Sequence, residues 1–185
     1  MDTGSHADVL VIGMVGAMSL PYVSALGDED DDWLRAVLVE RWGGEPIVGR
    51  GRANRVDDLE GLVALIGDER VGVLTYRISV DVCEIITLDA FREGVGVGRA
   101  LIEAVTERAR TAGASTLLVM TTNDNVGALR FYQRAGFRLN ELRCGAADEA
   151  RRVKPTIPLI GHDHIPIRDE LDLVRNVWDD PSAPS

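Results

Sequence analysis

The chain has 185 residues, of which 45% are hydrophobic, so it is long enough and apolar enough to bury one domain-sized core. Acidic residues outnumber basic ones by 30 to 20, and the resulting net charge of −10 argues against a nucleic-acid partner. No segment reaches the roughly 18 apolar residues of a membrane span, and the 2 cysteines do not form a disulfide framework, so we expect a cytoplasmic protein without a membrane partner.

The sequence divides into three parts. Residues 1–27 are an N-terminal extension, in which the apolar run Val9–Leu20 is expected to be either a first β-strand or a loosely ordered leader. Residues 28–178 are expected to form a single domain, and residues 179–185 a disordered tail.

The domain begins with an acidic run, Gly27–Asp32. Apolar residues follow at helical spacing over Trp33–Trp42, and Gly43 and Gly44 end the predicted helix. The acids complement the positive end of this helix, and the alternative function for them is a divalent-metal site.

Short apolar, β-branched segments predict the strands of the first half. Two of them flank a Gly-Asp-Glu-Arg turn and therefore indicate a hairpin. The predicted strands are Ile47–Ala53, Leu62–Ile66, Val71–Arg77 and Cys83–Leu88.

The second half alternates helices and strands. A helix is predicted over Arg99–Ala112, a strand over Thr116–Thr121, and a second helix with Asp124 or Asn125 as its N-cap. The mixture predicts an α/β (α+β) fold in which helices flank a bent, mostly antiparallel sheet.

The C-terminal region is predicted to contain a helix over Gly145–Lys154, a proline-broken loop and a strand over Arg168–Val174. The strand is either a purely structural edge strand or part of an acceptor pocket. His162 and His164 flank Asp163, which is either an ordinary turn or the start of a metal site.

A glycine-spaced segment, Glu93–Gly98, lies between a β-branched run and the helix over Arg99–Ala112. Glycine allows close approach of the backbone to a ligand, and a helix start presents unpaired N–H groups, so this segment predicts a phosphate cradle. No Lys-Ser or Lys-Thr follows it, which excludes a nucleotide P-loop, and its spacing fits a dinucleotide fingerprint poorly.

Two motifs together resemble the GNAT-type N-acetyltransferase family. From Asn125 to Phe137 the chain reads Asn-x-x-Ala-x-x-x-Tyr-x-x-x-Gly-Phe, similar to the second half of that family's core. Glu93–Gly98 resembles its acetyl-CoA pyrophosphate loop, and the resemblance covers about residues 59–142. The loop's usual leading Arg or Gln falls on Glu93, so we expect backbone N–H groups to make the cradle. Arg92 and Arg99 either reach a phosphate or form a solvated pair.

The resemblance implies acetyl-CoA as co-substrate and no metal. It implies that the strand before the loop pairs with the pantetheine arm and offers a backbone N–H to the thioester carbonyl. The residues expected to bind the cofactor are Leu88, Asp89, Ala90, Glu93, Gly94, Val95, Gly96, Val97, Gly98, Arg99 and Asn125.

The resemblance also implies catalytic roles. Tyr132 occupies the position of a phenol that gives a proton to the cofactor sulfur, whereas its alternative role is that of a core residue. Glu84 is the candidate general base, with a water relay or a structural ion pair as alternatives. Strand alternation would put Glu84, Ile86, Leu88 and Ala90 on one face.

The expected function is transfer of an acetyl group from acetyl-CoA to a primary amine of a small molecule or protein, directly within a ternary complex. A homodimer would be ordinary for such a protein. The competing function is a non-catalytic module that senses acyl-CoA, and a third is dinucleotide binding.

Overall fold

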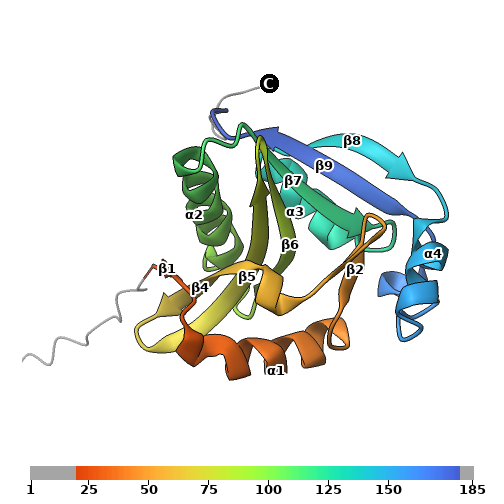
Figure 1. Cartoon of the computed structure of the whole chain (residues 1–185), viewed down its shortest axis with the longest axis horizontal. Coiled ribbons are helices and arrows are strands. Elements are labelled where there is room, and N and C mark those ends of the chain that lie inside the picture. The colour runs from red at the N-terminus through yellow and green to blue at the C-terminus, as the bar shows by residue number, and fades with distance from the viewer. Residues whose placement is uncertain (1–19, 180–185) are drawn as a thin grey trace, which may run out of the picture.

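The computed structural model describes residues 20–179, and its centre is a seven-stranded sheet in the order β1-β4-β5-β6-β7-β9-β8 (Figure 1). All neighbouring strands are antiparallel except β6 and β7. The expected mixed, mostly antiparallel sheet is therefore confirmed. The strands are β1 (Tyr22–Ala25), β4 (Glu60–Ile66), β5 (Glu69–Ser79), β6 (Val82–Ala90), β7 (Thr116–Thr122), β8 (Arg138–Arg143) and β9 (Glu170–Asn176).

Helices cover both faces of the sheet (Figure 1). The larger core joins one face to α2 (Val97–Thr111) and α3 (Val126–Arg134), and the smaller core joins the other face to α1 (Asp31–Trp42). α1 ends at Gly43, whose φ of 67° is left-handed, as its sequence predicts. A fourth helix, α4 (Ala146–Val153), follows β8. Within residues 20–179, no helix has the length and apolarity needed to cross a membrane.

Three predictions about the strands need correction or lie outside the structure. Ile47–Ala53 is not one strand but a separate hairpin of β2 (Ile47–Gly49) and β3 (Arg52–Asn54), because Arg50 and Gly51 both have positive φ and reverse the chain. The strand expected at Arg168–Val174 is β9, which lies inside the sheet because β8 pairs with its outer side. Apart from Leu20, the strand expected over Val9–Leu20 falls outside the described residues.

The two parallel strands separate part-way along the sheet. β6 pairs with β7 only from Val82 opposite Thr116 to Ile85 opposite Val119. Beyond that point β6 stays paired with β5 as far as Ala90, while β7 stays paired with β9 as far as Thr122. Two strand edges therefore face each other without a ladder between them.

A β-bulge in β6 changes which side chains face each helix. Ile85 is opposite Tyr76 but Thr87 is opposite Thr75, so Ile86 is the extra residue. Ile86 packs against the α1 core, whereas Leu88 packs against the α2 core. The alternation predicted from Glu84 to Ala90 is consequently wrong beyond Ile86.

The same bulge brings Asp89 to the α1 face. Asp89 is opposite Val73, a member of the α1 core, and its carboxylate contacts Trp42 at the end of α1. Glu84 also faces this side, where Arg50 of the β2–β3 turn contacts it. Two carboxylates of β6 therefore share one face of the sheet.

Candidate active site

The glycine loop joins β6 to α2 and leaves open space above its backbone. Gly94 and Gly96 have φ of 75° and 84°, and a Cβ built on either would meet no atom within 4 Å. α2 begins at Val97, so the N–H groups of its first turn lack intrahelical partners and point out of the helix end. Positive-φ glycines before a free helix N-terminus form an anion cradle.

The other side of this loop packs tightly against α3. A Cβ on Gly98 would lie 2.9 Å from Phe131, so only glycine allows the two helices to approach this closely. Between α2 and α3 lies a pocket of about 530 Å³. Four arginines line it, together with Phe131: Arg99, Arg130, Arg134 and Arg175.

Two arginines near the cradle already have carboxylate partners. Arg99 Nε donates to Glu103 at 2.8 Å, and Arg92 Nη2 donates to Glu69 at 3.0 Å. Both pairs are exposed, so water screens them and their side chains can exchange partners at small cost.

The unpaired edge of β6 offers backbone groups of alternate residues. Phe91 donates its N–H to Val71 of β5 at 2.8 Å, and the carbonyl of Asp89 also lies against β5 beside Gly72. Because main-chain groups alternate in direction along a strand, those of Leu88 and Ala90 point to the opposite edge, toward β7.

Tyr132 of α3 is 6% exposed and lies between two other aromatic rings. The ring centroids of Phe131 and Phe137 are 5.2 and 5.6 Å away, both in edge-to-face geometry. Burial raises the pKa of Tyr132, and the charge of Asp89 raises it further. The phenol is therefore protonated at neutral pH and can act as a proton donor.

Asn125, the other candidate from the sequence motif at this end of α3, caps the helix. Its Oδ1 accepts the N–H of Ala128 at 3.0 Å. The neighbouring Asp124 is 2% exposed and accepts the N–H of His162 at 2.9 Å. The β7–α3 turn is in this way joined to the segment between α4 and β9.

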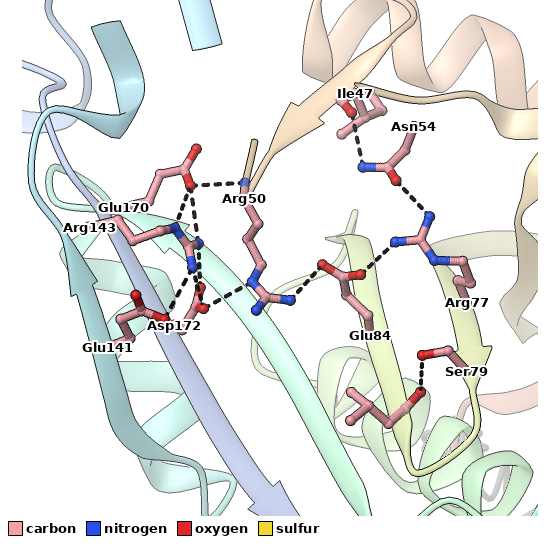
Figure 2. Close-up of polar contacts among 11 residues, drawn as sticks. Ile47, Arg50, Asn54, Arg77, Ser79, Glu84, Glu141, Arg143, Glu170 and Asp172 are labelled. Atoms are coloured by element: carbon pink, nitrogen blue, oxygen red, sulfur yellow. Dashed lines mark hydrogen bonds and ion pairs between the residues drawn. The ribbon is translucent and has the colours of Figure 1, made fainter. Parts of the chain in front are cut away.

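A charged cluster occupies the α1 face beside the strand separation (Figure 2). Glu84 accepts from Arg50 Nη1 at 3.2 Å and, with its other oxygen, from Arg77 Nη2 at 2.6 Å. Arg50 also donates from Nε to Asp172 at 2.9 Å and from its backbone N–H to Glu170 at 2.9 Å. Arg50 thus connects β6 to β9 across β7.

Arg143 of β8 completes this cluster. It donates to Asp172 at 2.5 and 2.6 Å and to Glu170 at 3.1 Å, and the two carboxylates are 0% and 3% exposed. Burial alone would lower the pKa of Arg143, but the hydrogen bonds and charges of Asp172 and Glu170 outweigh it and raise that pKa. Sequence reasoning missed this cluster, although acids at alternate positions of an otherwise apolar strand are a usable signal.

Asp89 lies apart from the cluster, at the end of β6. Its Oδ2 accepts the indole N–H of Trp42 at 2.7 Å. Burial raises the pKa of Asp89, while the Trp42 hydrogen bond and the charge of Arg41 act in the opposite direction. Lys154 in turn holds the end of α1, because its ammonium group donates to the carbonyls of Trp42 and Gly44.

Neither Cys83 nor the histidine pair forms a reactive centre here. Cys83 is fully buried, and this burial raises its pKa to about 12, so it is a core residue. His162, Asp163 and His164 form an exposed 3₁₀ turn. No group of three or more potential metal ligands occurs among residues 20–179.

The sequence pattern of the Acetyltransferase (GNAT) family matches residues 22–137, from β1 to the end of the turn after α3. The chain belongs to the GNAT acetyltransferase family. The uncharacterized protein YxbD of Bacillus subtilis (strain 168) is 41% identical over 147 residues, which are 79% of this chain and 92% of YxbD.

Solved GNAT structures share the fold. An IAA acetyltransferase from Bacillus cereus ATCC 14579 superimposes with a TM-score of 0.66 and 23% identity, over 84% of this chain and 99% of that one. A GNAT acetyltransferase from Elizabethkingia anophelis with acetyl-CoA bound gives a TM-score of 0.62 and 16% identity, over 84% and 97% of the two chains.

Arg143→Met tests whether the charged cluster holds the sheet together. Removing the cation leaves Asp172 and Glu170 buried without their main partner, so we expect a loss of about 3 kcal/mol in the free energy of unfolding. Arg152→Met breaks an exposed pair with Glu149 and should cost less than about 0.5 kcal/mol. Urea denaturation measures both, and equal losses would contradict this role of the cluster.

Proposed function

We propose that this GNAT protein transfers the acetyl group of acetyl-CoA to a primary amine of a small molecule or protein. The observation that carries the proposal is the glycine cradle, which directly follows the part of β6 that is not paired with β7. A phosphate group would fit the cradle, and an extended arm joined to it would fit the unpaired edge of β6. The Elizabethkingia relative, which has the same fold, holds acetyl-CoA.

The chain offers a contact for each part of such a molecule. Backbone N–H groups of residues 93–99 would hold the diphosphate at the helix end. The arginine-lined pocket between α2 and α3 adjoins this cradle through Arg99 and would receive the phosphate-bearing nucleotide end. Leu88 and Ala90 would pair with the amides of the extended arm, as an added strand does.

Bound acetyl-CoA supplies an activated acetyl thioester. A backbone N–H at the free edge of β6 would donate to the thioester oxygen, where negative charge develops. Tyr132 would give its hydroxyl proton to the sulfur as the bond between carbon and sulfur breaks. The raised pKa of Tyr132 keeps its hydroxyl protonated at neutral pH.

Direct transfer to the amine is favoured over a covalent acetyl-enzyme. Cys83 is fully buried with a raised pKa and so cannot serve as the nucleophile. The amine would approach from the α1 face, where Glu84 and Asp89 lie. Arg50 and Arg77 pair with Glu84, so Asp89 is the carboxylate on this side that suits an acceptor carrying positive charge.

Gly96→Ala tests the cradle, with Gly113→Ala as its matched control. Both glycines have nearly the same φ, 84° and 83°, and open space around a new Cβ, so each change should cost about 1 kcal/mol of stability. Only Gly96→Ala should weaken acetyl-CoA binding, by about tenfold or more in calorimetry, because its methyl group occupies the cradle. Equal affinities in the two variants would contradict this site.

Tyr132→Phe tests the proton donor in an assay of CoA release with a panel of amines that includes diamines, aminoglycosides and peptide N-termini. We expect kcat to fall about 100-fold across roughly pH 6 to 9, because the raised pKa keeps Tyr132 protonated over that range. Acetyl-CoA affinity should be unchanged. Should wild-type protein bind acetyl-CoA while no amine accelerates CoA release, the acyl-CoA sensor would replace the transferase.

A further inference from the structure

We propose that Asp89 is the general base that accepts the proton of the acceptor amine, and that Trp42 is the residue that positions it. The inference rests on the proposed transferase function. The Asp89 side chain would have this role in addition to the cofactor contacts expected of the β6 backbone. Asp89 would then take the place of Glu84 as the candidate base.

Glu84 is poorly placed to accept a proton. Each of its oxygens receives a guanidinium hydrogen bond, one from Arg50 and one from Arg77, and its side chain is only 16% exposed. It also lies in the paired part of β6, opposite Leu118 of β7. Glu84 is therefore a structural member of the charged cluster, which holds β6 to β9 through Arg50 (Figure 2).

Asp89 differs from Glu84 in both respects. It lies four positions beyond Ile85, the last residue of β6 that pairs with β7, where the two strand edges are free. Its Oδ2 accepts from Trp42, while Oδ1 has no hydrogen-bond partner among residues 20–179 and is not sealed from solvent. One oxygen thus fixes the orientation of the carboxylate and the other is free to accept a proton.

The surroundings of Asp89 raise its affinity for a proton, as a general base requires. The groups that act on its charge are Trp42, which donates to it, and Arg41, both of α1. Burial raises the pKa of Asp89, while the Trp42 hydrogen bond and the charge of Arg41 act in the opposite direction. The charge of Asp89 also raises the pKa of the Tyr132 phenol.

The proton transfers balance without any further reactant. An acceptor that arrives as an ammonium first loses one proton to water and reacts as the neutral amine. Asp89 Oδ1 then takes the proton that the amine nitrogen loses as its bond to the acetyl carbon forms. Tyr132 gives its hydroxyl proton to the sulfur as the carbon–sulfur bond breaks. A water then carries the proton from Asp89 to the Tyr132 phenolate, which restores both side chains.

Trp42 is placed for its role by the segment after α4. Lys154 is 8% exposed, and its ammonium group donates to the carbonyls of Trp42 and Gly44, at the end of α1. This contact fixes the last turn of α1 and therefore the direction of the Trp42 indole. Lys154, from the region between β8 and β9, in this way supports the Trp42–Asp89 hydrogen bond through the end of α1.

The experiment compares Asp89→Asn, Glu84→Gln and the control Asp68→Asn, which lies in the β4–β5 turn. CoA release is followed against pH with the most active amine of the panel, and acetyl-CoA affinity is measured separately by calorimetry. We expect Asp89→Asn to lower kcat about 100-fold or more at unchanged acetyl-CoA affinity, Asp68→Asn to keep kcat within about threefold, and Glu84→Gln to lower kcat far less than Asp89→Asn does.

Trp42→Phe provides a second measurement that needs no change at Asp89. Its indole N–H stabilises the charged carboxylate, so removing it should move the acid limb of the pH–rate profile to higher pH. The carboxyl carbon of Asp89, followed by NMR titration without acetyl-CoA, should show the same upward shift. A purely structural Trp42 would move neither.

Three results would overturn the proposal. They are full kcat in Asp89→Asn, a loss confined to Glu84→Gln, or an acid limb and a carboxyl titration that Trp42→Phe leaves in place. These results all require an active wild-type protein. If no amine accelerates CoA release by the wild type, the transferase function itself fails, and the role of Asp89 as a base fails with it.

Discussion

The last backbone pairing between β6 and β7 joins Ile85 to Val119, and everything that makes this domain suited to acetyl transfer lies beyond that point. Beyond that point β6 stays paired with β5 and β7 stays paired with β9, so a backbone ladder supports each of the separated strands. The freed backbone groups cannot remain unpaired away from water at no cost, and in the proposed function an extended ligand with amides would satisfy them. The glycine loop at the end of β6 would then meet the phosphates of the same ligand.

Charge pairing explains why the separated halves keep a fixed distance. Arg50 connects Glu84 on β6 with Asp172 on β9, and Arg143 neutralises the remaining charge of the two buried acids of β9. A methyl group on Gly49 would overlap Met120 of β7, so the β2–β3 hairpin lies directly on that strand. This hairpin therefore lies over the α1 face and joins β6 to β9 through Arg50.

Local patterns predicted most of the elements, because helices such as α1 and α2 have periodic apolar faces and glycine ends. Glycine spacing indicated the loop at residues 93–98, and the motif from Asn125 to Phe137 indicated the second half of the family core. β8 was missed, since five of its six residues are exposed and no alternation marks it. The bulge at Ile86 and the Arg50–Asp172 contact, 122 residues apart, arise from tertiary packing that no local pattern records. The distinct environments of Glu84 and Asp89 follow from those two features.

A crystal structure of the wild-type protein with acetyl-CoA tests the central claim most directly. The account predicts the diphosphate on the backbone of residues 93–99, the arm between β6 and β7, and the thioester between the Asp89 carboxylate and the Tyr132 hydroxyl. Glu84 should keep both arginine contacts. Acetyl-CoA bound elsewhere, or a thioester that faces a Glu84 released from Arg50 and Arg77, would contradict it.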